Sequence, residues 1–366
     1  MKNVCYFNTT KFWGGGEKLH LEYAIEFHKK GYNVWLVSDK NGILTNKALQ
    51  LGLDCNTISA GNLSFLNPIK LIKLVAFYRR NKIDTVIFST SQDAKLGSLS
   101  AKLAGLKNIV YLRGLATAIE NSLVNRFMFS KMITHLAVNS DATKNTVVQY
   151  LSNHLANIKI GTIYHGIEIN EDDTKDALIL NAIKEKRKGI VLGNAGRLTR
   201  QKGQHHLIEV ARILKSKNIE FTLFIAGTGE LKAELELKIA TYNLQLDVFL
   251  LGFVEDMETF NNSLDIFLLS SEWEGFGYVI VEAMVKSKPV VAFNISSNPE
   301  IISNNKTGFL VEFGDINGFT AKTQELIENE PLRKTMGQAG KQSVKDRFDI
   351  KDRITEFEYF ILGKEF

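Results

Sequence analysis

Short apolar and β-branched runs alternate with helical patterns in both halves of the chain, and this alternation constrains the fold more than any other feature. In the second half, Leu207, Val210, Ala211 and Leu214 have the spacing of one buried helix face. Short buried strands separated by helices favour a parallel, doubly wound sheet. We predict strands at 4–7, 34–37, 85–88, 109–112 and 136–138, then at 190–195, 221–226, 248–251, 266–269 and 289–293.

The chain length also fits a division into two domains. A chain of 366 residues usually forms about two domains of roughly 150–200 residues each. The strand–helix rhythm breaks between residues 163 and 188, where the acidic run 171–173 precedes a charged helix. We interpret that run as a solvated linker rather than a metal site. The sequence therefore predicts an α/β fold with Rossmann-like domains at 1–166 and 167–347, which face each other across a ligand cleft.

Composition excludes several classes of protein. With 45% hydrophobic and 23% charged residues, the chain has the balance of a globular protein and not that of a disordered or collagen-like one. No apolar run reaches the roughly 18 residues of a membrane helix, and we identify no signal peptide. Cys5 and Cys55 are too few for a disulfide framework or a metal–thiolate cluster. We expect a cytoplasmic protein.

The charge is distributed unevenly. Residues 1–165 hold 20 Lys and Arg against 9 Asp and Glu, whereas the remainder holds 25 against 31. The basic half includes two amphipathic stretches with aromatic residues, 69–80 and 125–131. Each stretch predicts either a helix packed on the sheet with its lysines in water, or peripheral contact with an anionic membrane. We predict no nucleic-acid partner, because no recognised binding motif accompanies the charge.

Glycine-rich loops follow several of the predicted strands, at 14–17, 193–197, 227–230 and 274–277. Glycine lets backbone N–H groups approach an anion, and the following helix dipole favours negative charge there. Each loop by itself could be no more than a tight turn. Arg197 and Lys202 lie in one strand-to-helix loop, and two fixed cations beside exposed amides suit a diphosphate.

Two carboxylates bracket the last of these loops. Glu274 precedes a Gly-Phe-Gly turn, and Glu282 lies inside an apolar helix. An unpaired carboxylate is expensive to bury, so Glu282 needs a hydroxyl or N–H partner. The two hydroxyls of a ribose could be this partner. Alternatively, Glu282 could be a structural glutamate that is satisfied by protein groups near the helix start.

Taken together, the motifs are similar to those of the retaining GT-B glycosyltransferases of family 4, the group 1 glycosyltransferases. The resemblance covers essentially the whole chain and is densest from Gly193 to Glu300. It includes a Glu-x7-Glu motif formed by Glu274 and Glu282. The other segments that carry it are 139–144, 164–167, 196–198, 201–203, 225–229 and 251–254.

The resemblance implies a role for each matching residue. Arg197 and Lys202 would clamp the donor diphosphate, Glu274 would contact the donor sugar, and these three are the expected catalytic residues. Glu282 would hold the ribose hydroxyls. The other expected donor-binding positions are Gly15 and Gly16 over the phosphates, Phe253 beside the nucleobase, and Gly196, Gly227, Gly275, Phe276 and Gly277 in the loops.

One position departs from the family pattern. Many relatives carry a histidine after the fourth strand of the first domain, where this chain has Arg113. Arginine is not a general base at neutral pH, so we expect Arg113 to contact donor phosphate or an anionic acceptor. We interpret the chain's other candidate histidines as structural or surface residues: His135, His165, His205 and His206.

The expected activity is a retaining, hexosyltransferase-type transfer from a nucleotide-diphosphate sugar, UDP favoured, to a hydroxyl of a glycan or lipid-linked acceptor. The product would belong to a cell-surface polysaccharide or lipopolysaccharide. Cations and helix amides would carry the leaving-group charge, so we expect no metal and no cofactor. The resemblance also implies a terminal helix at 348–366 that returns to the first domain. We expect a monomer or weak dimer, with peripheral attachment to the inner face of the cytoplasmic membrane.

Other functions remain open at this point. A non-catalytic nucleotide-sugar-binding protein or a nucleotide-sugar epimerase could share the fold. A phosphorylase would need a lysine-bound pyridoxal phosphate and a much longer chain. An NAD-type oxidoreductase would need Gly-x-Gly-x-x-Gly and an acidic residue about 20 positions later, and neither half has the full pattern.

Overall fold

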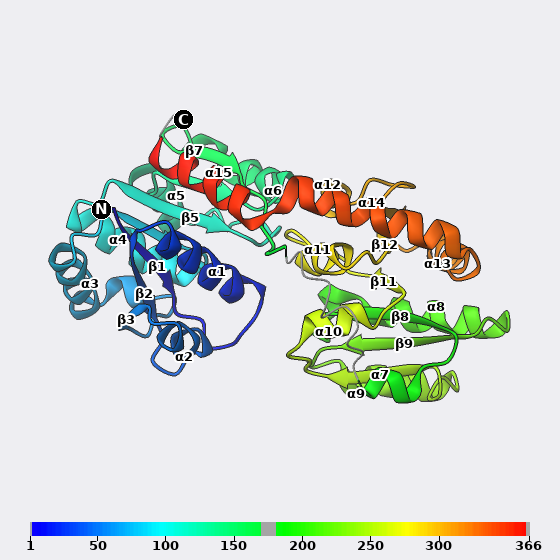
Figure 1. The fold of residues 1–366 in the computed structure, drawn as a ribbon. Helices are drawn as coiled ribbons and strands as arrows, with labels where there is room; N and C mark the ends of the chain where they lie inside the picture. The colour runs from blue at the N-terminus through cyan, green and yellow to red at the C-terminus, as the bar shows by residue number, and fades with distance from the viewer. Residues whose placement is uncertain (1, 170–180, 364–366) are drawn as a thin grey trace. The chain divides into compact units, whose positions relative to one another are not determined.

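The computed structural model describes residues 2–169 and 181–363. The chain divides into two compact units: unit 1 comprises Met1–Gly166 with Lys351–Phe366, and unit 2 comprises Ile167–Ile350 (Figure 1). The predicted acidic linker run at 171–173 lies outside the described residues. Among the residues that are described, no helix is long and apolar enough to cross a membrane.

Unit 1 is built on a parallel sheet in the order β3-β2-β1-β4-β5-β6-β7. The central strand β1 pairs with β2 on one side and β4 on the other. The five strands predicted in this half are present, and the two edge strands β3 and β7 were not predicted. The strands are β1 (Asn3–Asn8), β2 (Asn33–Ser38), β3 (Asp54–Thr57), β4 (Thr85–Phe88), β5 (Asn108–Arg113), β6 (His135–Val138) and β7 (Lys159–Thr162).

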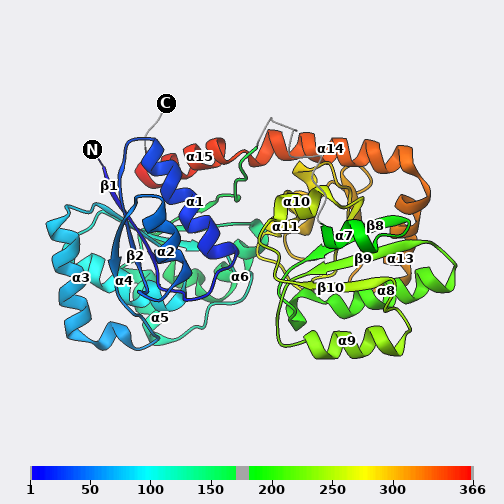
Figure 2. The same ribbon diagram turned by 60° about the horizontal axis from the view of Figure 1, so that its bottom comes forward.

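Helices cover both faces of this sheet. Helices α3, α4 and α5 lie side by side on one face, and the rings of Phe88, Tyr111 and Phe129 form the core beneath them (Figure 2). The helices are α1 (Gly15–Lys29), α2 (Ile43–Gln50), η1 (Ser64–Leu66), α3 (Pro68–Arg80), α4 (Ser91–Ala104), α5 (Leu123–Lys131), α6 (Asp141–Leu151), η2 (Ser152–His154) and α15 (Ile350–Leu362).

The last helix, α15, packs on the opposite face of the unit 1 sheet, beside α1. The Phe357 ring lies 5.3 Å from that of Tyr23 and 6.2 Å from that of Phe27. Lys159 Nζ donates a hydrogen bond to the carbonyl oxygen of Phe360 at 2.7 Å. Helix α15 is therefore an integral layer of unit 1.

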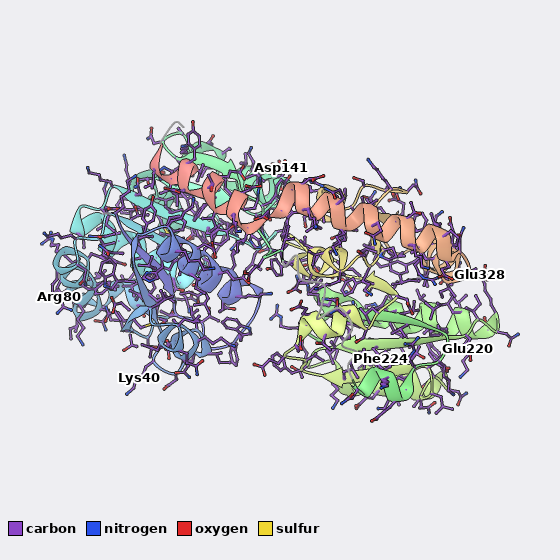
Figure 3. The ribbon with its side chains drawn as sticks, viewed as in Figure 1. Lys40, Arg80, Asp141, Glu220, Phe224 and Glu328 are labelled. Atoms are coloured by element: carbon purple, nitrogen blue, oxygen red, sulfur yellow. The ribbon has the colours of Figure 1, made fainter. Side chains whose placement is uncertain are left out.

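Unit 2 is built on a second parallel sheet, in the order β10-β9-β8-β11-β12-β13. The five strands predicted in this half are again present, and the edge strand β13 was not predicted. Figure 3 labels Phe224 of β9, which is fully buried and stacks on Phe249 of β10 at 5.4 Å. The strands are β8 (Ile190–Ala195), β9 (Phe221–Ala226), β10 (Val248–Gly252), β11 (Ile266–Leu269), β12 (Val290–Phe293) and β13 (Gly308–Val311).

The unit 2 helices also form two layers. Helix α13 packs beside α8, whereas α14 packs against α11. The predicted apolar face of α8 is buried at all four positions. The helices are α7 (Asn181–Lys186), η4 (Arg200–Lys202), α8 (Gln204–Ser216), α9 (Lys232–Thr241), α10 (Met257–Asn262), α11 (Tyr278–Val285), α12 (Asn298–Ile301), α13 (Ile316–Glu328) and α14 (Glu330–Phe348). These two parallel-sheet units confirm the predicted pair of Rossmann-like domains.

Candidate functional site

The unit 2 sheet has a topological switch point between β8 and β11. These strands are neighbours, but the chain continues from β8 to β9 on one side and from β11 to β12 on the other. Loops that leave two adjacent parallel strands in opposite directions open a crevice at the carboxyl ends, where ligands bind in such sheets. Lys202 follows β8 and Glu274 follows β11.

Lys202 and Glu274 form an ion pair at this switch point. Lys202 Nζ lies 2.6 Å from Glu274 Oε1, and the two side chains are only 16% and 6% exposed. Ser271 Oγ donates a second hydrogen bond to the same oxygen at 2.6 Å. Glu274 Oε2 accepts no hydrogen bond from the described residues. One carboxylate oxygen therefore fixes the lysine, and the other is available to a ligand.

The loops after β8, β9 and β10 approach one another too closely for side chains. A Cβ on Gly227 would lie 1.9 Å from the carbonyl oxygen of Gly196, and the Gly227 N–H donates to the carbonyl of Gly252 at 2.7 Å. Gly203, with a left-handed φ of +59°, would place a Cβ 2.2 Å from the carbonyl oxygen of Ser270. Only glycine fits at Gly227 and Gly203, because a Cβ at either position would overlap a backbone carbonyl oxygen.

The predicted cation Arg197 lies in the first of these loops. Its side chain is exposed and forms no ion pair among the described residues. Its backbone carbonyl accepts a hydrogen bond from Gln204 Nε2 at 3.1 Å, and Gln204 itself is buried at the start of α8. The backbone under Arg197 is fixed while its guanidinium group is free to meet an anion.

The Glu274-to-Glu282 segment turns from β11 into α11. Gly277, at φ +81°, precedes the first turn of α11, so the amides of 275–277 lie next to the helix N-terminus. Phe276 is buried and packs edge-on against Phe348 of α14 at 5.5 Å. Glu282 is half-buried in α11, between the buried residues Val281 and Ala283. On the neighbouring loop after β10, Phe253 is exposed.

Unit 1 holds the remaining predicted residues. Gly15 and Gly16 are the first two residues of α1. Arg113 ends β5 and is only 6% exposed, and it donates hydrogen bonds to the Thr117 carbonyl and hydroxyl at 2.9 and 3.0 Å. These partners are neutral, and Arg113 forms no ion pair within the described parts of the chain.

The unit 1 sheet has its own switch point, between β1 and β4, which the sequence analysis missed. There, Asp93 accepts hydrogen bonds from the hydroxyl and N–H of Thr9 at 2.5 and 3.1 Å, and from the Thr90 hydroxyl at 2.6 Å. Burial raises the pKa of the Asp93 carboxyl. Thr90 and Asp93 have the spacing of a capping pattern at the start of a helix. This spacing could have identified the Asp93 cluster from the sequence alone.

The four histidines singled out from the sequence all have a lowered pKa. Burial lowers the pKa of His165 to about 3, and that of His135 and of His206 to about 4. The pKa of His205 is also lowered, chiefly by burial. His135 and His165 belong to unit 1, and the adjacent pair His205 and His206 opens α8.

Comparison with known families decides the identity of unit 2. Residues 177–343, which include the residues described at the β8/β11 switch point, match the model of the family called Glycosyl transferases group 1. Unit 2 therefore carries a domain of the group 1 glycosyl transferases. The predicted family is thereby confirmed.

The chain has relatives along most of its length. It is 27% identical over 301 residues, 79% of each chain, to the capsular polysaccharide biosynthesis glycosyltransferase CapM of Staphylococcus aureus. It is 26% identical over 316 residues to the UDP-Gal:alpha-D-GlcNAc-diphosphoundecaprenol alpha-1,3-galactosyltransferase of Escherichia coli, covering 81% of this chain and 80% of the relative. Its fold matches the crystal structure of Anabaena Alr3699/HepE in complex with UDP and glucose, with a TM-score of 0.84 and 20% identity over 100% of both chains.

The fold gathers most of the predicted residues of this glycosyl transferase at one edge. The carboxyl edge of the unit 2 sheet carries Arg197, Lys202, Glu274, Phe253 and the predicted loop glycines. Gly15, Gly16 and Arg113 lie in unit 1. The sequence analysis did not anticipate the ion pair of Lys202 with Glu274, or Ser271 as its third member. The ligand role of each residue stays a prediction.

Proposed function

We propose that this chain transfers a hexose, with retention of anomeric configuration and without a metal ion, from a UDP-sugar to a hydroxyl of a glycan or lipid-linked acceptor. The observation that carries the proposal is the buried Lys202–Glu274 pair at the β8/β11 switch point, beside the exposed Arg197. Two cations, glycine-loop amides and a helix N-terminus at one edge suit a diphosphate.

Each member of the site has a distinct task in this proposal. A lysine ammonium has three N–H donors, and Glu274 uses one of them, so two remain for phosphate oxygens. Arg197 supplies a planar pair of donors to the same diphosphate. Glu274 Oε2 accepts a hydroxyl of the donor sugar, and Glu282 accepts the ribose hydroxyls.

The transfer itself relies on electrostatics. As the glycosidic bond breaks, negative charge grows on the diphosphate, and fixed cations and amides stabilise that charge without reorganising. The acceptor hydroxyl attacks from the same face and gives its proton to the leaving phosphate oxygen, which preserves the anomeric configuration. This step needs neither a protein base nor a metal ion. Histidines with a pKa as low as those of His135, His165 and His206 are weak bases, which is consistent with that route.

The relatives guide the choice of donor and acceptor. One relative is named for UDP-Gal and a diphosphoundecaprenol acceptor, another for capsular polysaccharide biosynthesis. The Alr3699/HepE structure contains UDP and glucose. By analogy, we assign this chain a UDP-hexose donor and an acceptor in the synthesis of a cell-surface polysaccharide or lipopolysaccharide.

A lipid-linked acceptor would bring the enzyme to a membrane surface, and α3 suits that contact. Asn67 caps this helix by accepting from the amides of Ile69 and Lys70. Ile69 and Ile72 are 62% and 68% exposed, next to Lys70 and Lys73. Apolar side chains flanked by lysines are typical of a helix that lies on an anionic bilayer. We therefore extend the proposal to peripheral binding through α3.

A thermal-shift screen in excess EDTA tests the donor assignment. UDP-, GDP- and ADP-hexoses are each added to the full chain, and UDP-hexoses should raise the melting temperature most. A ligand at 100 times its dissociation constant stabilises by about 2.7 kcal/mol, which is readily measured. Product from the best donor is then examined by NMR for its anomeric configuration. An inverted product, or transfer that stops in EDTA and returns with magnesium or manganese, would overturn the proposal.

A further inference from the structure

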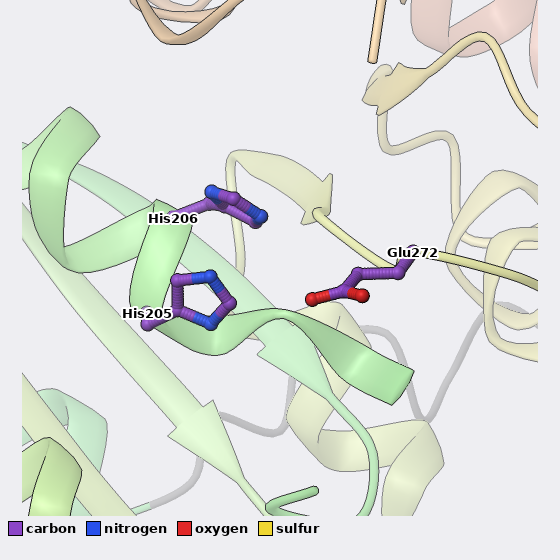
Figure 4. A group of neighbouring side chains, drawn as sticks. All are labelled: His205, His206 and Glu272. Carbon is purple, nitrogen blue, oxygen red and sulfur yellow. The ribbon is translucent and has the colours of Figure 1, made fainter. Parts of the chain in front are cut away.

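A second cluster of polar side chains lies on unit 2, outside the Lys202–Glu274 pair. His205 and His206 follow Gln204 in the first turn of α8, and Glu272 lies in the loop after β11. Each offers one ligand atom, and these atoms lie within 4.8 Å of one another. Figure 4 shows the Glu272 carboxylate directed at the two imidazole rings. The proposed glycosyl transfer uses none of these three residues.

One buried nitrogen atom of this cluster lacks a hydrogen-bond partner in the described residues, and the Glu272 carboxylate has only a long ion pair. His206 Nε2 is buried and has no hydrogen-bond partner among the described residues. Within the same ranges, no hydrogen bond to the Glu272 carboxylate is present, and its nearest cation is the exposed Arg200, with Nε at 3.8 Å. Buried nitrogen atoms and carboxylates normally have partners, so this cluster is suited to an added ligand.

The surrounding structure holds the His206 ring and the backbone at Glu272 in place. The His206 ring packs edge-on against Phe293 at 5.4 Å and Phe313 at 6.1 Å. The Glu272 N–H donates to the Gln201 carbonyl at 2.8 Å, and Gln201 Nε2 donates to the Trp273 carbonyl at 3.1 Å. These bonds tie the segment before α8 to the loop that carries Glu272, so the site is largely formed in advance.

We propose that His205, His206 and Glu272 bind one divalent transition-metal ion, with zinc as the best fit. Two imidazoles and one carboxylate suit zinc and its neighbours, whereas magnesium and calcium prefer oxygen ligands. Zinc–nitrogen bonds are about 2.0–2.1 Å long, so small side-chain rotations bring the three atoms around one ion. The nearby Lys238 is already paired with Glu209 at 2.9 Å. A fourth position is left for water.

The site would clamp α8 to the loop after β11. Lys202 immediately precedes the turn into α8, and Glu274 lies two residues after Glu272. The bound ion would therefore hold the two loops of the switch point together without touching the transferred sugar. This role is structural and is compatible with a transfer reaction that continues in EDTA.

The test uses the full chain without a histidine tag, stripped by a chelator. Zinc is titrated calorimetrically and in competition with a chromogenic chelator, and the parent should bind one equivalent. His206→Phe keeps the ring contacts with Phe293 and Phe313 but removes a ligand, and Glu272→Gln removes the charge. Each should weaken zinc binding at least tenfold. His28→Asn, at an exposed histidine of α1, should bind zinc as the parent does.

Cobalt gives a second readout, because its visible absorption reports the coordinating atoms. The stripped parent should develop ligand-field bands on addition of cobalt, and the His206→Phe and Glu272→Gln variants should lose them. If the parent binds no zinc, or if both variants bind it with the parent's affinity, the proposed site is wrong. If His28→Asn loses binding instead, the ion is held elsewhere and the proposal also fails.

Discussion

At the scale of single residues, the Lys202–Glu274 pair defines the candidate site. The two residues are 72 positions apart, so the sequence could suggest a ligand for each but not that they bind each other. A nearly buried ion pair depends on both partners, because removing one leaves an uncompensated charge. The pair that would position Lys202 toward the proposed diphosphate should therefore also affect the stability of unit 2.

Removing the charge of Lys202 should destabilise the protein more than removing both charges. Lys202→Met leaves the Glu274 carboxylate buried with the Ser271 hydroxyl as its one hydrogen-bond donor among the described residues, at a cost of about 3 kcal/mol. Adding Glu274→Gln removes the orphaned charge and should restore part of the lost stability. Thermal unfolding by circular dichroism should rank the parent first, the double variant second and Lys202→Met last. A single variant as stable as the parent would show that the pair is dispensable.

The close contact between Gly227 and Gly196 leads to a second prediction about a single residue, the effect of replacing Gly227. Gly227→Ala places a methyl group 1.9 Å from a carbonyl oxygen, so the loops after β8 and β9 must separate. We expect a loss of more than about 2 kcal/mol, as for other strained backbone positions, together with weaker donor binding. Gly61→Ala is the matched control, since a Cβ there has nothing within 4 Å. Equal melting temperatures for the two variants would contradict the close approach of the loops.

At the scale of elements, every interior strand of the two sheets could be predicted from sequence, whereas three of the four edge strands could not. Interior strands such as β4 are buried on both faces and consist of apolar or β-branched residues. The missed strands β3, β7 and β13 each end a sheet. β3 (Asp54–Thr57) and β7 (Lys159–Thr162) are half-exposed and carry polar residues, so they lack a continuous apolar run. β3 and β7 are strands because each forms backbone hydrogen bonds with one neighbouring strand, not because of their composition.

The exposed face of α3 leads to a prediction about membrane binding. Ile72→Glu should reduce binding to vesicles of anionic phospholipid, because it replaces an exposed apolar contact with a charge of the membrane's own sign. Leu237→Glu is the matched control, at a residue of α9 that is 69% exposed. Co-sedimentation with vesicles should show a loss for the α3 variant alone. Equal binding by both variants would remove α3 from the proposed membrane contact.

At the scale of the whole molecule, a buried histidine of unit 1 makes the free energy of unfolding depend on pH. Unit 1 contains His20, which is fully buried beside Tyr6, with neither ring nitrogen hydrogen-bonded in the described residues. Burial lowers the pKa of His20 to about 3. The unfolded chain, with a histidine pKa near 6.5, binds a proton at a higher pH than the folded chain does. Unit 1 should therefore be fully stable above about pH 6.5 and lose stability as the pH falls toward 3.

The His20→Leu variant measures this effect. Between pH 7 and pH 5 the parent should lose about 2 kcal/mol of unfolding free energy through His20, and the variant should not. Denaturant titrations of both proteins at the two pH values give the comparison. His28→Leu changes an exposed histidine of the same helix and should retain the parent's pH dependence. If His20→Leu loses as much unfolding free energy between pH 7 and pH 5 as the parent does, groups other than His20 cause the loss.

The most direct test of the central claim is the single-turnover rate of sugar transfer in EDTA, measured for variants of the two proposed diphosphate cations. Arg197→Ala and Lys202→Met should each slow transfer roughly a hundredfold, or about 3 kcal/mol, because the charge they stabilise develops in the transition state. The double variant should fall short of the product of the two losses, since both cations act on one diphosphate. Arg200→Ala, at an exposed arginine of the same loop, should transfer at the parent rate. If Arg197→Ala and Lys202→Met are folded and transfer sugar as fast as the parent, the diphosphate clamp is wrong.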